Sequence, residues 1–352
     1  MFTTTDAADG ECVRFEGGDI SRSRSSSRGA ASRSNHSPAE GNILMLNTSQ
    51  AIAGGRGGGS VRSEPTRPST AFQWESHRSA VFGAAYRILG TVAEAEDVTQ
   101  EVWLRAATTD LSHVRDLHAW LVTLSARTSY NVLKSARMRR ESYIGAWLPE
   151  PLLTGPDTAT TVLVDESVST AMLVIMETLT PAERVALVLH DVFDFPFGRI
   201  AEILGSSPAA TRKLASRGRA RIAAAGVPPQ ASRAETERVL EAFRAAADAG
   251  EMARLVELLD PDAVYIADGG GKTTAARRPV HGAEPISRLL MRQIEIRQPD
   301  RFRIIEVNGR PAMVTFQGGQ PVWLDTADVT DGRIVTFRRL VNPEKLARLG
   351  HI

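Results

Sequence analysis

Residues 180–222 read TPAERVALVLHDVFDFPFGRIAEILGSSPAATRKLASRGRARI, a stretch that predicts a helix, a shorter helix, a tight turn and a final basic helix. Thr180 belongs to the residue types that cap helices, and Pro181 suits the first helical position because the N–H that proline lacks has no partner there. Gly205 can adopt the left-handed conformation that a tight turn needs, and Ser207, followed by a proline, can begin the next helix. The pattern therefore indicates a helix-turn-helix.

The final helix of this motif is rich in cationic side chains. Such a helix fits the major groove of DNA, where cations can reach phosphates and base edges. The alternative is a surface helix whose arginines are only solvated, but the turn residues and the basic bias fall within the same few positions, which favours DNA. The cationic residues are Arg212, Lys213, Arg217, Arg219 and Arg221.

Length and composition place this motif in a multidomain protein. A chain of 352 residues accommodates two or three domains, and 42% hydrophobic with 24% charged residues is ordinary for a globular protein. With a net charge of +1, any nucleic-acid surface must arise from local clustering of cations. The single cysteine, Cys12, rules out an internal disulfide. The sequence has no apolar signal core and no run of about 20 apolar residues, so we expect a cytoplasmic protein without a membrane partner.

Residues 1–69 are rich in Ser, Gly and Arg and contain too few apolar residues to bury a core. We expect this segment to be a disordered N-terminal tail and assign it no function. An alternative is that the gene start is placed too early and that Met45 is the initiator.

A helical domain is predicted over residues 70–140, where apolar residues recur at helical spacing in two stripes. Between the stripes, Thr91 can cap a helix whose first turns are acidic, as the positive end of the helix dipole favours. The place of Trp120 on the second stripe favours a core role over one in base stacking. The first stripe includes Phe72, Val81, Phe82, Ala85, Ile88 and Leu89, and the second includes Leu117, Trp120, Leu121 and Leu124.

Two motifs of this domain, together with the helix-turn-helix, carry a family resemblance. AEDVTQEVWLRA occupies residues 95–106, and AWLVTLSARTSYNVLKSARMRR occupies residues 119–140. With a linker and the helix-turn-helix after them, they resemble the bacterial extracytoplasmic-function (ECF) sigma factors of the sigma-70 family, in which a four-helix region 2 domain precedes a region 4 domain. The resemblance implies a factor that binds core RNA polymerase, recognises −10 and −35 promoter elements and initiates transcription.

The resemblance also implies which residues contact each partner. Core RNA polymerase would be bound at its clamp helices and flap, with Asp97, Gln100 and Glu101 docking on the clamp helices. Many family members carry Asn where this chain has Arg127, which leaves Asn131 as the better candidate for holding an unstacked base. The residues implied at the −10 element are Arg127, Asn131, Lys134, Arg137 and Arg140, and those implied at the −35 element are Thr211, Arg212, Lys213, Ser216, Arg217 and Arg219.

The linker over residues 141–166 is unusually apolar for a solvated connection. Two prolines stiffen its WLPEPL motif. We expect the linker to dock into a groove or else to pack against the neighbouring helical domain. The motif consists of Trp147, Leu148, Pro149, Glu150, Pro151 and Leu152.

The chain continues past the helix-turn-helix domain, at residues 167–226, with an α+β pattern over residues 233–346. Helical patterns at residues 235–249 and 252–259 precede five strand-like runs, AVYIAD, RFRIIEV, PAMVTFQ, PVWLDTADV and RIVTFRRL. This segment resembles a SnoaL-like (NTF2-like) domain, a cone in which helices cover a curved sheet and enclose a pocket. Hairpin turns are predicted at Asn308-Gly309, Gly318-Gly319 and Asp331-Gly332.

Three motifs resemble those of the sigma-J type of ECF sigma factor, which carries this extension. They are WLPEPL, DGGGK and NPEKL, the last with Glu344 where the family has Asp. The resemblance implies that the C-terminal domain regulates the factor in cis through these motifs, with no separate anti-sigma factor and no cofactor, and leaves open a small-molecule ligand in the pocket. DGGGK consists of Asp268, Gly269, Gly270, Gly271 and Lys272, and NPEKL of Asn342, Pro343, Glu344, Lys345 and Leu346.

The GGGKTT sequence does not match a nucleotide-binding loop, because a P-loop ending at Lys272 and Thr273 would require glycine where the chain has Ile266. The glycines can instead bring the backbone close to another surface, while Asp268 and Lys272 pair across the turn or reach the linker. The alternative is a flexible hairpin tip.

Two other functions are alternatives to a sigma factor. One is a helix-turn-helix regulator that acts without polymerase docking. The other is a DNA-tethered SnoaL-like enzyme, with candidate acids and bases at Asp325, Asp328, His281 and Tyr265. Strand alternation places about half of such residues outside the cone, and no spacing marks an acid and base pair, so we expect no enzymatic activity.

Overall fold

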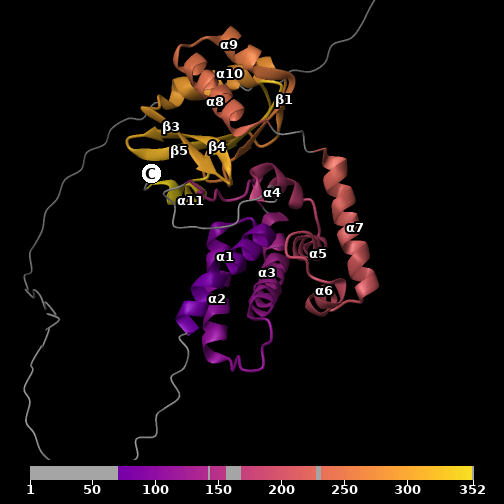
Figure 1. Cartoon of the computed structure of the whole chain (residues 1–352). Coiled ribbons are helices and arrows are strands. Elements are labelled where there is room, and N and C mark those ends of the chain that lie inside the picture. Colours follow the sequence, from indigo (N-terminus) through magenta and orange to yellow (C-terminus); the bar gives the residue numbers. More distant parts are fainter. Residues whose placement is uncertain (1–69, 142, 156–167, 227–230, 351–352) are drawn as a thin grey trace, which may run out of the picture. The chain divides into compact units, whose positions relative to one another are not determined.

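The computed structural model describes residues 70–141, 143–155, 168–226 and 231–350 (Figure 1). The tail predicted over residues 1–69 lies outside the described residues. No helix in these described ranges is both long enough and apolar enough to cross a membrane.

The first part of the described chain consists of three helices, α1 (Thr70–Leu89), α2 (Val92–Thr108) and α3 (Leu117–Glu141). Four helices are expected from the family resemblance, so that expectation is wrong for residues 70–141. The first apolar stripe, the acidic motif and the second apolar stripe form one helix each, α1, α2 and α3, and α3 extends over 25 residues.

The predicted helix-turn-helix is confirmed. Thr180 and Glu183 cap its first helix reciprocally: the Thr180 hydroxyl accepts from the Glu183 N–H, and the Glu183 carboxylate accepts from the Thr180 N–H. Gly205 has a φ of 64° and makes the left-handed turn, and the Ser207 side chain caps the basic helix. The elements are α4 (Thr170–Met176), α5 (Pro181–Asp191), α6 (Phe197–Leu204) and α7 (Pro208–Ala225).

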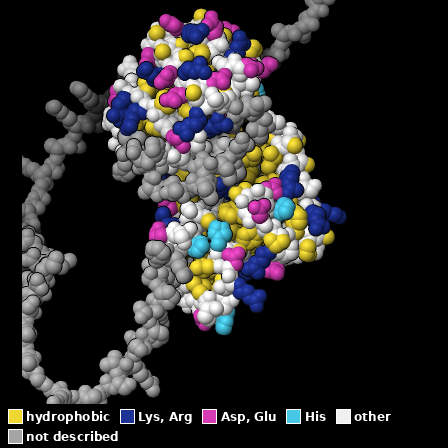
Figure 2. Space-filling view, viewed as in Figure 1, with side chains coloured by type: hydrophobic (Ala, Val, Ile, Leu, Met, Phe, Trp, Pro, Cys, Tyr) yellow, Lys and Arg dark blue, Asp and Glu magenta, His cyan; other side chains and the backbone are white. Residues whose placement is uncertain are grey.

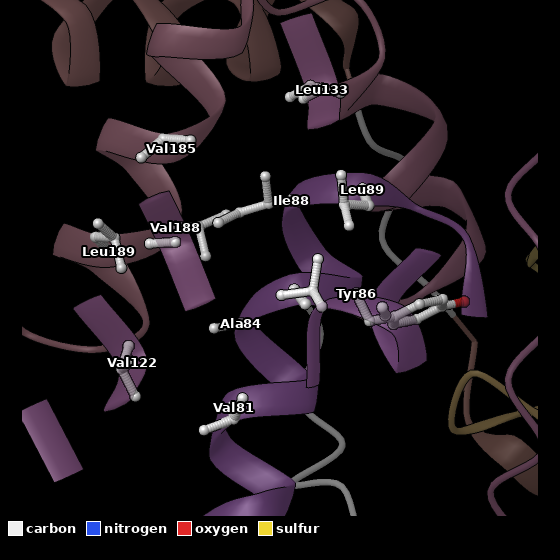
Figure 3. Packing of buried hydrophobic residues seen from close by; sticks show 14 of the residues in the cluster. Val81, Ala84, Tyr86, Ile88, Leu89, Val122, Leu133, Val185, Val188 and Leu189 are labelled. Carbon is white, nitrogen blue, oxygen red and sulfur yellow. The ribbon is translucent and has the colours of Figure 1, made fainter. Parts of the chain in front are cut away.

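One hydrophobic cluster contains the buried faces of both helical regions. Figure 3 shows Val81 and Ile88 of α1, Val122 of α3 and Val188 of α5 within this cluster. The predicted region 2 and region 4 segments therefore share a core in this structure.

A buried arginine connects the same two regions by hydrogen bonds. Arg184 of α5 is 2% exposed, and its guanidinium donates to the backbone oxygens of Met176, at 3.0 Å, and Ile88, at 2.9 Å. It also pairs with the Glu177 carboxylate at 2.6 Å. Because Ile88 belongs to α1, Arg184 joins the end of α1 to region 4.

The C-terminal part contains a six-stranded sheet in the order β2-β1-β6-β5-β4-β3. All five predicted strands are confirmed, and each predicted hairpin turn has positive φ at both residues. The two-residue strand β2 was not predicted from sequence, being too short to show a pattern. The strands are β1 (Leu259–Asp268), β2 (Val280–His281), β3 (Arg301–Val307), β4 (Arg310–Gln317), β5 (Gln320–Thr330) and β6 (Arg333–Leu340).

α8 (Arg233–Asp248), α9 (Met252–Leu258) and α10 (Ala283–Arg297) pack against one face of this sheet (Figure 1). α8 and α9 agree with the predicted helices, whereas α10 was missed. A short helix, α11 (Pro343–Leu346), and a 3-10 turn at Ala347–Leu349 follow the last strand.

The two faces of the sheet bury different partners, because successive strand residues point to opposite sides. Met313 and Phe337 lie in a cluster with α8, α9 and α10. Val314 instead lies in a cluster that includes Leu148 of the linker and Leu346 of α11. The linker is therefore part of the hydrophobic covering of the second face.

Candidate nucleic-acid and partner interfaces

The basic helix α7 presents three of the predicted −35 residues together on its exposed surface. Arg212, Lys213 and Ser216 are all exposed, and the Arg212 guanidinium lies 5.2 Å from the ring centroid of Phe197. Their spacing of one, three and four residues places them on one side of the helix. This face can approach a DNA groove.

Thr211 does not belong to that face. It is fully buried, and its hydroxyl donates to the Ser207 carbonyl at 3.0 Å and also bonds the Ser206 hydroxyl at 2.7 Å. Ala215 and Gly218, four and seven residues further on, are buried on the same side of α7. The prediction that Thr211 contacts DNA is therefore wrong in this conformation.

The remaining cations of α7 are held by acidic residues of α5. The Glu183 carboxylate accepts from Arg217 at 2.9 Å and from Arg221 at 2.7 Å, and Asp191 pairs with Arg219. Burial of Glu183 opposes its ionisation, but hydrogen bonds from Arg217 and Thr180 hold the pKa of this carboxyl below its ordinary value. The three arginines are thus oriented, while about half of each side chain remains exposed.

Helix α3 presents the predicted −10 residues along one exposed stripe. Arg127, Asn131 and Lys134 are exposed at spacings of four and three residues, and the Lys134 ammonium lies 3.9 Å from the ring centroid of Tyr130. Arg137 and Arg140 are not among the residues whose side chains the structure describes. Trp120 is partly buried against the shared core, as expected.

Helix α2 exposes acidic and apolar side chains side by side. Asp97 and Gln100 are exposed, and Glu101 is half-buried and pairs with Arg105. Trp103 and Leu104 are 42% and 50% exposed, which sequence reasoning missed although both lie in the motif AEDVTQEVWLRA. Large apolar side chains exposed beside acidic ones are typical of a partner surface.

The linker, not Thr91, caps α2. The Thr91 hydroxyl donates to the Glu94 carboxylate at 2.7 Å and makes no hydrogen bond to the helix backbone. The buried carboxylate of Glu150 instead accepts from the backbone N–H of Ala93 at 3.0 Å. The cap predicted at Thr91 is therefore wrong, because a charged oxygen from the linker occupies the positive end of the helix.

The carboxylate of Asp268 joins all three sigma-J-type motifs. It is fully buried, and it accepts from the Tyr143 hydroxyl at 2.6 Å, the Leu148 N–H at 2.9 Å and the Gly270 N–H at 3.0 Å. Lys345 pairs with it at 2.7 Å and also donates to the Leu148 carbonyl. Burial, followed by the adjacent carboxylate, raises the pKa of Tyr143, so the phenol retains the proton that it donates.

The glycines of DGGGK are required by packing. A Cβ on Gly270 would lie 2.3 Å from the Asn342 side-chain amide, and one on Gly271 would lie 2.9 Å from Ile144. Both residues also have positive φ. Of the two roles predicted for Asp268 and Lys272, Asp268 reaches the linker, whereas Lys272 pairs with Glu344.

The loop and the linker border a cavity of about 360 Å³. The linker contributes Ile144 and Gly145, and the loop contributes hydroxyl and cationic side chains at Thr273, Lys272 and Arg277. This cavity lies at the loop and the linker, whereas the pocket implied by the family resemblance lies inside the cone.

Inside the cone, the candidate catalytic carboxylate is already paired. Both oxygens of Asp325 accept from Arg339 at 2.7 Å, and Arg339 also donates to Gln293. Burial raises the pKa of Asp325, and the Arg339 guanidinium opposes that shift. Asp328 is likewise paired, with Arg338, and His281 is exposed, so these residues form no free acid and base pair.

Acidic and basic side chains are interspersed over α8 to α10 on the face shown in Figure 2. The described surface of α8 to α10 therefore shows no patch of a single charge sign in that view. The predicted DNA contacts remain those of α3 and α7.

Two family descriptions match the helical part, "Sigma-70 region 2" over residues 74–139 and "Sigma-70, region 4" over residues 169–222. The "ECF RNA polymerase sigma factor SigJ" of Mycobacterium tuberculosis (strain ATCC 25618 / H37Rv) is 36% identical over 292 residues, which cover 78% of this chain and 92% of that protein. This chain belongs to the ECF RNA polymerase sigma factors. A "Probable ECF RNA polymerase sigma factor SigI" of M. tuberculosis (strain CDC 1551 / Oshkosh) is 30% identical over 283 residues, covering 78% of this chain and 93% of that protein. The crystal structure of M. tuberculosis SigJ matches with a TM-score of 0.65 and 33% identity, covering 79% of this chain and 98% of that one.

The sigma factor thus carries region 2 in α1 to α3 and region 4 in α4 to α7. The α+β domain that follows has the expected SnoaL-like, NTF2-like architecture. Both findings confirm the predicted fold class.

Asp268→Asn is expected to lower the free energy of unfolding of this sigma factor by about 3 to 5 kcal/mol, because Lys345 is left buried without its counterion. Adding Lys345→Met is expected to recover part of that loss, since both charges are then removed. Urea unfolding of the full chain measures both values. The exposed Lys272–Glu344 pair provides the control, and Glu344→Gln is expected to cost no more than about 1 kcal/mol. Equal costs for Asp268→Asn and Glu344→Gln would contradict the role of the buried pair.

Proposed function

We propose that this sigma factor docks on the clamp helices of core RNA polymerase through α2, reads the −10 element with α3 and the −35 element with α7, and is regulated in cis by its C-terminal domain. The observation that carries the regulatory part is the Asp268 carboxylate, which bonds the linker between the two DNA-reading regions to the C-terminal domain. A linker held in this way limits how far regions 2 and 4 can separate.

The polymerase-binding part rests on the surface of α2. Asp97 and Gln100 are exposed beside the apolar side chains of Trp103 and Leu104. The C-terminal domain reaches the same helix, because Arg348 pairs with Glu96 at 2.7 Å and with Glu150 of the linker at 3.1 Å. Docking on α2 and attachment of the C-terminal domain therefore involve neighbouring residues.

The proposed regulation requires two arrangements of the chain whose free energies differ by a few kcal/mol. In the arrangement described here, the linker is docked, and regions 2 and 4 share a core. A small molecule that binds the cavity beside Ile144 more tightly in one arrangement would shift the balance. Regulation of this kind would need no separate anti-sigma factor.

Asp97→Arg is expected to weaken binding of the full-length protein to purified core RNA polymerase at least tenfold, because it places a cation in the acidic docking surface. Residues 70–226 alone are expected to bind the core enzyme. Co-elution and a binding titration measure both. The control is Asp248→Arg, a charge reversal on exposed α8, which should leave the affinity unchanged. Wild-type affinity in Asp97→Arg would contradict docking through α2, and failure of both wild-type forms to bind would contradict the polymerase-binding function itself.

Lys213→Ala is expected to weaken binding of the full chain to duplex DNA and to reduce the slope of log K against log salt by about 0.9, the loss of one phosphate contact. Fluorescence anisotropy at a series of salt concentrations gives the slope. Arg254→Ala on α9 removes an exposed cation far from the predicted interface in sequence and should leave the slope unchanged. An unchanged slope for Lys213→Ala would remove this residue from the DNA interface.

Ending the chain after Gly226 is expected to change transcription severalfold relative to the full-length protein, because region 4 and the linker lose the contacts made by the C-terminal domain. The measurement is multiround transcription by core polymerase with each form, at a promoter mapped from the transcripts that the full-length protein induces. Equal transcription by both forms at saturating and at limiting sigma factor would contradict regulation in cis.

A further inference from the structure

The turn between β3 and β4, at Asn308-Gly309, is buried although it is a hairpin tip. Asn308 is 2% exposed and Gly309 is half-buried, with φ values of 54° and 73°. The turn between β5 and β6, at Asp331-Gly332, has φ values of 50° and 73°, but Asp331 is exposed. The two turns therefore have the same backbone type but differ in burial. The hairpin alone does not explain why Asn308 is buried.

The backbone of this turn pairs with the linker. The Asn308 N–H donates to the Leu152 carbonyl at 2.8 Å, and the Leu152 N–H donates to the Asn308 side-chain oxygen at 3.3 Å. Next to it, Leu153 forms an antiparallel bridge with Val307, and the Gly309 N–H donates to the Thr154 hydroxyl at 2.9 Å. Residues 152–154 of the linker thus lie alongside the turn, joined to it by one antiparallel bridge and by hydrogen bonds.

The side-chain amide of Asn308 extends this contact to both helical regions. Its nitrogen donates to the Tyr86 hydroxyl of α1 at 2.7 Å and to the Val168 carbonyl, just before α4, at 2.8 Å. Tyr86 in turn donates to the Glu150 carbonyl at 2.7 Å. Only an amide can accept from Leu152 and donate twice in this way, so the residue type matches the site.

We infer that Asn308 is a positioning residue that fixes region 2, the linker and the start of region 4 to one another through a single buried amide. Tyr86, Val168 and Leu152 would all lose a hydrogen-bond partner if the turn withdrew. Since buried polar groups without partners are costly, the three segments are released together. This inference rests on the proposed regulation in cis and assigns to it a contact outside the WLPEPL, DGGGK and NPEKL motifs.

Asn308→Gly in the full chain tests the inference, because glycine keeps the positive φ of the turn and removes only the amide. Asp331→Gly is the matched control at the exposed turn. Spin labels on cysteines at Ser112 and Ala224, both exposed, with Cys12 replaced by Ser, report the distance between regions 2 and 4. We expect one dominant distance in wild type and in Asp331→Gly. In Asn308→Gly we expect the population of molecules with longer distances, divided by the population at the wild-type distance, to rise at least fivefold.

Asn308→Asp provides a second variant of nearly the same shape that donates at most one hydrogen bond, and so cannot serve both Tyr86 and Val168, and it decides the question if the glycine variant does not fold. A folded Asn308→Gly or Asn308→Asp protein with the wild-type distance distribution would overturn the inference and leave Asn308 as a turn residue. Transcription by the same variants, reconstituted with core polymerase, separates the two hypotheses. Changed distances with unchanged transcription would support the positioning role and contradict the proposed regulation in cis.

Discussion

The arrangement of the linker depends on one buried negative charge, the carboxylate of Asp268. A carboxylate removed from water must be compensated by a counterion and by hydrogen bonds, or it destabilises the fold by several kcal/mol. Its partners come from separate segments: Tyr143 and Leu148 from the linker, Gly270 from its own loop and Lys345 from α11. Because the charge is satisfied only when all of them are present, the linker, the loop and the C-terminal helix are held jointly.

The docked linker contributes to the shared core of regions 2 and 4, because Leu152 belongs to that cluster. Glu150 and Leu152 are buried, and their backbone carbonyls accept from Tyr86 of α1 and from Asn308 of the β3–β4 turn. In that arrangement Arg184 reaches the end of α1, where its guanidinium is compensated by two carbonyls and Glu177. Separation of the regions would expose this arginine to water. The stripes of α3 and α7 that are predicted to contact DNA are exposed in this arrangement.

Local signals in the sequence predicted much of this fold. The cap at Thr180, the left-handed Gly205 and the hairpin pairs such as Asp331-Gly332 depend only on neighbouring residues, so their chemistry is readable without tertiary information. Helix α10 was missed although Ile286, Leu290 and Ile294 show helical spacing, so a readable signal was overlooked there.

The remaining differences arise from tertiary contacts. Whether Thr211 faces DNA or the core depends on how α7 packs, and the spacing of one helix does not reveal that. The cap on α2 comes from Glu150, more than fifty residues away, so the local signal at Thr91 was misleading. The role of Asn308 likewise depends on Tyr86 and Val168, which the sequence does not place near it.

Among the described residues, the exposed and the buried charged contacts between the C-terminal domain and the rest of the chain differ in what they can contribute. Arg348 is 40% exposed and Glu96 is 47% exposed, so their pair is worth at most about 1 kcal/mol, or about fivefold in an equilibrium constant. If α2 is the polymerase-docking helix, linkage requires docking and this attachment to weaken each other by the same factor. A larger effect of the C-terminal domain must therefore come from buried contacts, such as those of Asp268 and Asn308. On that hypothesis the exposed pair adjusts polymerase affinity only slightly, whereas the buried contacts of Asp268 and Asn308 hold the linker.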